Sequence, residues 1–226
     1  MADVTTSSSQ TRIILVRHGE SKVMVRRVVG GPRTCSGLSD LGREQASRLR
    51  DRWDSERWFE PDVLYASGYP RAIETAEIIR PSLGDLPVIV DPGFGEHDPG
   101  EQCDGLTYDE FVERYPEASM WWDANDPFVA TFPGGETVAA FHYRVGQAVR
   151  RAIQANEGKT IVISCHGGVI DCIFRQFLRT PSIGMFQLHP LNTSVTEFTQ
   201  IRPDKWQLER YNDHVHLAGL PTSTTT

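Results

Sequence analysis

Short runs of apolar residues recur along the chain, separated by longer stretches in which apolar positions return every three or four residues. The runs with the length of buried strands occupy residues 13–16, 63–65, 86–90 and 160–163, and two later runs, 194–198 and 206–211, predict closing strands. Alternation of strands and helices is typical of an α/β fold. We therefore predict a three-layer sandwich, with helices on both sides of a central, mostly parallel sheet.

The helical stretches carry recognisable start and stop signals. One helix is predicted to begin near Glu136 and to stop at Gly158, with apolar residues at three- and four-residue spacing between them. A second begins at Pro70, a favoured first helical position, and a third is capped by Ser39. A fourth follows Gly168 and carries its own apolar stripe. These helices are expected to pack one face each on the sheet.

Residues 91–135 differ from the rest of the chain. This segment is rich in Pro, Gly, Asp and Trp, and its only predicted helix is a short one opened by a capping box of Thr107 and Glu110. Such an irregular segment beside a regular sheet usually shapes an active site, so we predict a lid. Polar residues at 1–10 and 217–226 predict flexible tails around a single domain at 11–216.

Composition and charge exclude several classes of protein. The 226 residues carry 23 basic and 30 acidic side chains, a net charge of −7, with a sequence pI near 5.5. Nucleic-acid binders usually have a basic face, so a nucleic-acid partner is not expected. The four cysteines form no Cys-x-x-Cys pair, which disfavours a structural zinc site. No apolar run approaches the roughly 18 residues of a membrane span and no leader is visible, so we predict a cytoplasmic protein.

Five residues with chemically useful side chains stand at predicted strand ends. Arg17 and His18 follow the strand at 13–16, and His166 follows the strand at 160–163. Arg71 is the second residue of the helix after the strand at 63–65, and Glu96 follows the strand at 86–90. Open α/β sheets bind ligands at this edge. Glycines after each histidine and the helix amino termini behind them predict an anion site.

At these residues the sequence resembles the histidine phosphatase superfamily, the phosphoglycerate-mutase-like proteins. The resemblance runs through RHGES at 17–21, GLSDLGREQA at 37–46, YASGYPRAIETA at 65–76, PGGET at 133–137 and CHGG at 165–168. It implies that His18 is the nucleophile and forms a phosphohistidine, and that Glu96 protonates the leaving alcohol. It also implies that Arg17, Arg71 and His166 bind the phosphoryl group. Spacing alone leaves open which histidine attacks.

The substrate-binding prediction extends the catalytic set by three residues. The predicted substrate-binding residues are Arg17, Ser21, Met24, Arg71, His166 and Gly167. Met24 departs from the family pattern, which often has an asparagine six residues after the nucleophile. With other apolar residues, among them Val28, Val29, Trp121, Trp122 and Phe128, it lines an apolar vestibule or simply packs in a core.

The basic residues on either side of Met24 allow two interpretations. Lys22, Arg26, Arg27 and Arg33 bring four cations between residues 22 and 33 without an acid among them. They either steer an anionic substrate toward the site or form a solvated loop.

We therefore predict a metal-independent phosphomonoester hydrolase, a histidine acid-type phosphatase, that acts on a small anionic organic phosphate and needs no cofactor. Alternatives are a cofactor-dependent phosphoglycerate mutase and a catalytically weak binding or scaffold module on the same fold. The acids that follow Glu96 disfavour a substrate with a second phosphate, and therefore the mutase. A metal-dependent hydrolase built on His18, His97 and His166 lacks zinc-ligand spacing. The substrate, the pathway and the oligomeric state stay open, and a homodimer is one option.

Overall fold

A six-stranded sheet forms the centre of the computed structural model, which describes residues 10–118, 126–184 and 186–221. Its strands are β1 (Arg12–Arg17), β2 (Val63–Ala66), β3 (Val88–Val90), β4 (Thr160–Cys165), β5 (Val195–Arg202) and β6 (Lys205–Asp213), in the order β3-β2-β4-β1-β5-β6. The three pairings among β1 to β4 are parallel, and β5 and β6 join antiparallel. The predicted mostly parallel sheet is thus confirmed, with each strand close to its expected position.

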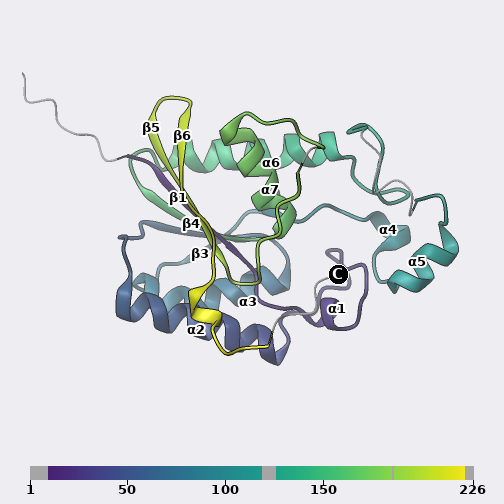
Figure 1. Cartoon of the computed structure of the whole chain (residues 1–226), viewed down its shortest axis with the longest axis horizontal. Coiled ribbons are helices and arrows are strands. Elements are labelled where there is room, and N and C mark those ends of the chain that lie inside the picture. Colours follow the sequence, from purple (N-terminus) through teal and green to yellow (C-terminus); the bar gives the residue numbers. More distant parts are fainter. Residues whose placement is uncertain (1–9, 119–125, 185, 222–226) are drawn as a thin grey trace, which may run out of the picture.

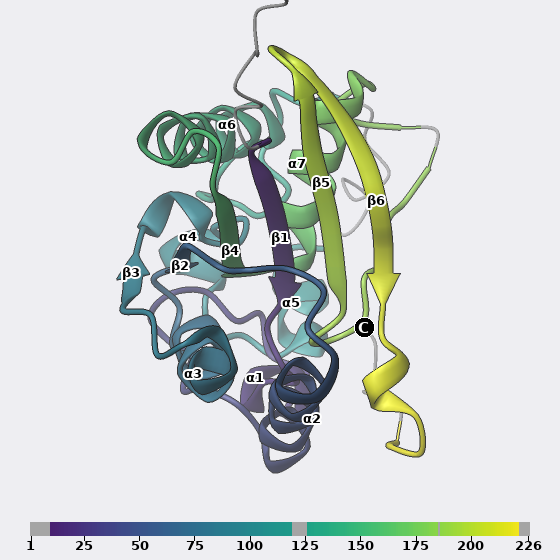
Figure 2. The same cartoon turned by 90° about the vertical axis from the view of Figure 1, so that its left-hand side faces the viewer.

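Helices cover both faces of the sheet, as Figures 1 and 2 show, and complete the predicted three layers. The helices on one face are α2 (Asp40–Glu56) and α3 (Pro70–Ile79), continued by the 3₁₀ turn η1 (Arg80–Leu83); those on the other are α6 (Val138–Ala155) and α7 (Gly167–Leu178). Alternation along β1 supplies both cores: Ile13 and Leu15 pack toward α6 and α7, whereas Ile14 and Val16 pack toward α2 and α3. The four predicted helices are confirmed.

The segment at 91–135 contains more helix than its sequence predicts. Besides α5 (Tyr108–Arg114), which has the expected capping box, it forms the 3₁₀ turn η2 (Pro92–Phe94) and α4 (Gly100–Cys103). The prediction of a single short helix was therefore wrong, because elements of three or four residues are too short for periodicity to reveal. The same holds for α1 (Lys22–Val25), a single turn capped by Ser21.

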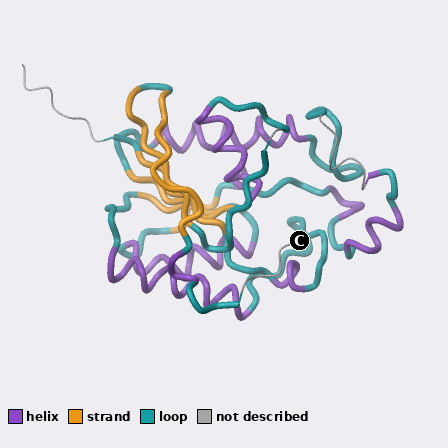
Figure 3. Tube along the Cα trace, in the orientation of Figure 1, coloured by secondary structure: helices purple, strands orange, loops and turns teal. Residues whose placement is uncertain are grey.

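The short helices α1, α4 and α5 gather at one end of the layers (Figure 3), where residues on and around them form a separate core. That core contains Val29, Cys103, Phe111, Ala118 and Phe132. The segment is therefore a packed wall beside the carboxyl ends of the parallel strands. Trp121 and Trp122, for which the sequence left a vestibule or a core position open, lie outside the described residues.

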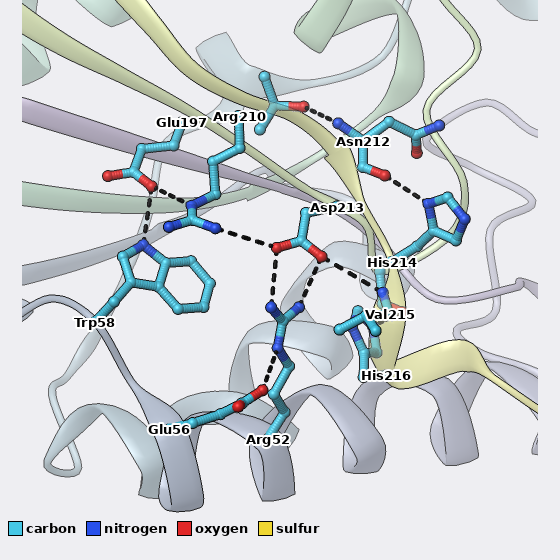
Figure 4. Close-up of polar contacts among 12 residues, drawn as sticks. Arg52, Glu56, Trp58, Glu197, Arg210, Asn212, Asp213, His214, Val215 and His216 are labelled. Atoms are coloured by element: carbon cyan, nitrogen blue, oxygen red, sulfur yellow. Dashed lines mark hydrogen bonds and ion pairs between the residues drawn. The ribbon is translucent and has the colours of Figure 1, made fainter.

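A polar network fixes the chain after β6 to α2 and β5 (Figure 4). Glu197, only 2% exposed, accepts hydrogen bonds from Arg210 Nε at 2.8 Å and Trp58 Nε1 at 2.9 Å. Arg52 donates to both carboxylate oxygens of Asp213 at 2.9 Å. Bidentate, half-buried pairs of this kind hold their geometry better than isolated surface pairs. They hold in place the 3₁₀ turn η4 (Val215–Leu217) that follows β6.

No helix within the described ranges is both long and apolar enough to cross a membrane.

Candidate active site

The loop after β1 is held from three sides at the carboxyl edge of the sheet. The His18 N–H donates to Cys165 O at 2.9 Å, and Asn192 Nδ2 donates to His18 O at 2.8 Å. The Gly19 N–H donates to Thr75 Oγ1 at 3.1 Å. These partners come from β4, the approach to β5, and α3. The main chain that carries His18 is consequently fixed before any ligand binds.

Two glycines allow α2 to approach this loop backbone to backbone. A Cβ on Gly19 would lie 2.4 Å from Gly42 O, and one on Gly42 would lie 2.0 Å from Glu20 O. Either distance is far below contact, so the close approach depends on both glycines. Ser39 adds a bond from its Oγ to Glu20 Oε1 at 2.7 Å, which ties the start of α2 to the same loop.

The imidazole of His18 is fixed in one tautomer. Its Nδ1 lies 2.6 Å from Gly19 O, an acceptor, so this nitrogen carries the proton. Its Nε2 accepts a hydrogen bond from Arg71 Nε at 3.1 Å. Burial, followed by the charges of Arg71 and Arg17, lowers the pKa of His18 well below its ordinary value. The ring is therefore neutral at neutral pH, and its Nε2 lone pair can attack an electrophile once the Arg71 Nε–H turns from it to the incoming anion.

Two guanidinium groups stand beside this nitrogen. Arg71 is buried near the start of α3, where its Nη1 donates to Gly30 O at 3.2 Å and its guanidinium carbon lies 4.5 Å from the centre of the Tyr69 ring. Arg17, at the end of β1, donates from Nη1 to Pro190 O at 2.5 Å. Its buried Nε has no hydrogen-bond partner among the described residues. The two guanidinium groups together form a cationic pocket suited to a phosphoryl group.

His166 packs against His18 from β4, with its ring centroid 5.0 Å away. Ser67 Oγ lies 2.7 Å from His166 Nε2 and accepts the Tyr69 N–H at 3.3 Å. Ser67 therefore holds the Nε2 side of the His166 ring. Nδ1 is buried and has no partner in the described part of the chain. Burial and the nearby charges of Arg71, His18 and Arg17 also lower the pKa of His166 well below its ordinary value.

Glu96 faces the amino terminus of α7. The Gly168 N–H donates to its Oε2 at 3.1 Å, and the His97 N–H donates to its Oε1 at 3.0 Å. This carboxyl group lines the same cavity as Arg17, His18 and Arg71. The structure thus brings Glu96 to the edge at which both arginines and both histidines meet.

Arg144, which the sequence did not single out, holds the Glu96 loop. Its Nη1 donates to Gly93 O at 3.1 Å and to Gly95 O at 3.0 Å, and its Nη2 donates to Glu96 O at 3.2 Å. Its Nε and Nη2 also pair with both carboxylate oxygens of Glu136, at 3.0 and 2.7 Å. All five guanidinium protons are thereby used. The sequence does not reveal this role of Arg144, because the three acceptors in the Glu96 loop are main-chain carbonyls, which any residue type supplies.

A cavity of about 850 Å³ opens from His18. Ser21 and Met24 line it, as do Val28 and Val29. His166 and Gly167 do not: His166 is fully buried behind His18, and Gly167 begins α7. Phe128 is 77% exposed and lies outside the lining.

The basic residues near α1 lie outside the lining as well. Arg33 pairs with Glu101 at 3.1 Å and with Asp104 at 3.6 Å, and Lys22, Arg26 and Arg27 are not lining residues. Among the residues that the structure describes, no group of three or more His, Cys, Asp or Glu side chains could hold a metal ion.

Comparisons with known proteins agree with this arrangement. The family model of the histidine phosphatase superfamily (branch 1) matches residues 13–214. Phosphoglycerate mutase-like protein 4 of Arabidopsis thaliana is 34% identical over 91% of this chain and 86% of its own length. The metal-independent phosphoserine phosphatase of the same plant is 28% identical, over 96% and 88%. The solved structure of Bacillus stearothermophilus YhfR has a TM-score of 0.79 and 29% identity, over 92% of this chain and 99% of its own.

Proposed function

The chain belongs to the histidine phosphatase superfamily and is a phosphatase, and on that premise we propose that it hydrolyses phosphomonoesters without a metal, through a phosphohistidine on His18. One observation carries the proposal. His18 is buried and neutral, and its unprotonated Nε2 lies 3.1 Å from Arg71 Nε in the wall of a cavity that Arg17 and Glu96 share. A lone pair beside two fixed cations is what an in-line attack on a phosphoryl group requires.

In the first step, His18 Nε2 attacks phosphorus and the bond from phosphorus to the ester oxygen breaks. Arg17 and Arg71 stabilise the charge on the phosphoryl oxygens. His166, fully buried with its ring centroid 5.0 Å from that of His18, positions the attacking ring. Glu96 gives its proton to the departing alkoxide, which otherwise leaves poorly.

In the second step, water attacks the phosphohistidine, and the Glu96 carboxylate takes the proton from that water. Phosphate leaves, and the lone pair returns to His18 Nε2. Glu96 is thus proton donor in one step and proton acceptor in the next.

The purified enzyme is expected to release inorganic phosphate from phosphomonoesters in excess chelator and without added bisphosphoglycerate. This measurement tests the proposed function directly. Interconversion of 2- and 3-phosphoglycerate that requires the bisphosphate and runs far faster than phosphate release would make the protein a mutase instead. Activity that disappears with chelator would overturn the metal-independent mechanism.

Replacing Glu96 with glutamine is expected to lower kcat/KM about a hundredfold for an alkyl phosphate and much less for p-nitrophenyl phosphate, whose phenolate leaves without a proton. Because Arg144 holds the Glu96 main chain, Arg144→Met should show the same selectivity for poor leaving groups, with a smaller loss. The measurement is the slope of log kcat/KM against leaving-group pKa.

Arg151→Met is the matched control for Arg144→Met. Arg151 lies two turns further along α6, has a side chain that is 57% exposed, and among the described residues pairs only with the Asp91 side chain, at 3.2 Å. It should leave the slope unchanged. Equal losses on alkyl and aryl esters in Glu96→Gln would contradict the acid role, and an unchanged slope in Arg144→Met would contradict the positioning role.

A further inference from the structure

We infer that the alcohol released at this site is bulky and carries no anionic group of its own. The inference rests on the proposed phosphomonoesterase function and concerns only the part of the substrate beyond the phosphoryl group. The sequence predicted a small anionic organic phosphate as substrate. The alcohol inferred from the cavity is larger and adds no negative charge to that of the phosphoryl group.

The size of the cavity indicates a large leaving group. Its volume of about 850 Å³ lies in the upper part of the roughly 300–1,000 Å³ typical of sites for drug-sized ligands. Arg17, His18 and Arg71 hold the phosphoryl group, which fills only a small part of such a volume, so most of the space is left for the alcohol. The apolar side chains that line this space are Val23, Val28, Val29, Val129, Phe132, Val138, Phe141, Ile183 and Phe186. Such walls stabilise an apolar body by excluding water from it.

The cavity lining offers no unpaired lysine or arginine side chain to an anionic group on the alcohol. Among its described lining residues, only Arg17, Arg71 and Arg175 are lysine or arginine, and the described residues include every lysine and arginine of the sequence. The first two stand at the phosphoryl end. A carboxylate or second phosphate on the alcohol would therefore need Arg175.

Arg175 is already committed to protein acceptors. It is 4% exposed, and its Nε pairs with Asp171 Oδ2 at 2.6 Å. Its Nη1 donates to Pro181 O at 2.8 Å and its Nη2 to Phe186 O at 2.7 Å. Three of the five guanidinium protons are thus held by protein acceptors, and Asp171 balances the charge. A ligand anion at the two remaining protons would be repelled by the Asp171 carboxylate, and displacing Asp171 would leave that half-buried carboxylate unpaired.

Apart from His97, whose Nε2 lies 2.5 Å from Glu136 O, the titratable side chains that remain in the lining add negative charge or none. Asp126 lines the cavity, is exposed, and makes no ion pair within the described part of the chain. His142 also lines it, and burial lowers the pKa of His142, so the ring is neutral at neutral pH. The field at this end therefore repels a second anion and tolerates a cation.

Matched aryl esters test the inference. Phenyl phosphate, 2-naphthyl phosphate, 3-carboxyphenyl phosphate and 3-(aminomethyl)phenyl phosphate differ in bulk or charge while the leaving phenols remain similar. We expect kcat/KM for the naphthyl ester to exceed that for the phenyl ester. We expect the aminomethyl ester to exceed the carboxy ester at least about tenfold, since a charge a few ångströms away changes binding by that much or more. A carboxy ester equal to or better than the aminomethyl ester would overturn the inference.

A charge reversal ties the preference to the cavity. Asp126→Lys should reduce the aminomethyl-to-carboxy ratio, whereas Asp54→Lys, the same change on the exposed side of α2, should not. An unchanged ratio in Asp126→Lys would contradict the assignment to this wall. The proposed function and the substrate preference fail in different ways. If even phenyl phosphate is not hydrolysed the proposed function is wrong, whereas hydrolysis of phenyl phosphate together with a preference for the carboxy ester refutes only the inference.

Discussion

His18→Ala is expected to lose phosphatase activity by roughly 10⁴-fold or more, because the variant lacks the atom that bonds to phosphorus and the remaining groups only bind. Rapid quenching of wild-type enzyme with labelled substrate should trap a phosphoenzyme that is labile to acid and stable to base. The variant should not form it. The ring is buried among groups that would remain, so circular dichroism and thermal melting serve to show that the variant is folded.

His189→Ala is the control for labelling, because His189 is an exposed histidine that does not line the cavity. It should label as strongly as the wild type. Labelling of His18→Ala at the wild-type level would show that another residue is the nucleophile.

The environment of His18 also fixes the sign of its pH dependence. Burial and the charges of Arg71 and Arg17 lower the pKa of His18 well below its ordinary value, so the reactive neutral ring persists as the pH falls through 6.5. The rate of phosphoenzyme formation, measured by labelling, should accordingly not fall through protonation of His18 until the pH is well below 6.5.

Arg71→Lys is expected to lower kcat by about 10²–10³-fold, corresponding to about 2–4 kcal/mol of transition-state stabilisation. Arg71 reaches His18 with Nε and Gly30 O with Nη1 from one rigid plane. A lysine ammonium carries the same charge on a single atom and cannot keep the Gly30 O contact while it presents a planar pair of N–H groups to the phosphoryl oxygens.

Arg50→Lys makes the same change in an exposed side chain of α2 and should leave kcat unaltered. The measurement is the steady-state rate on p-nitrophenyl phosphate, for which proton donation matters little. Near-normal turnover in Arg71→Lys would show that position 71 supplies charge alone.

The sequence predicted the layers and the edge at which the site forms because the signals for both are local. A run such as 13–16 identifies a strand, and Arg17 and His18 directly after it are placed by chain direction alone. The capping box at Thr107 and Glu110 is a contact within one turn and was found for the same reason. The one-turn helices α1 and α4 were missed because they are shorter than any period.

By itself, then, the sequence determined which chemistry-bearing side chains the sheet collects at one edge. Tertiary structure alone decided their protonation states and partners. The Nε2 contact of His166 is made by Ser67, 99 residues away, and the position of Glu96 depends on Arg144, 48 residues away. Whether Arg175 is free to bind an anion is decided by Asp171 together with two carbonyl groups. Hydrogen bonds to main-chain oxygens carry no residue-type signature, and burial depends on every element around a group, so neither could be inferred from local spacing.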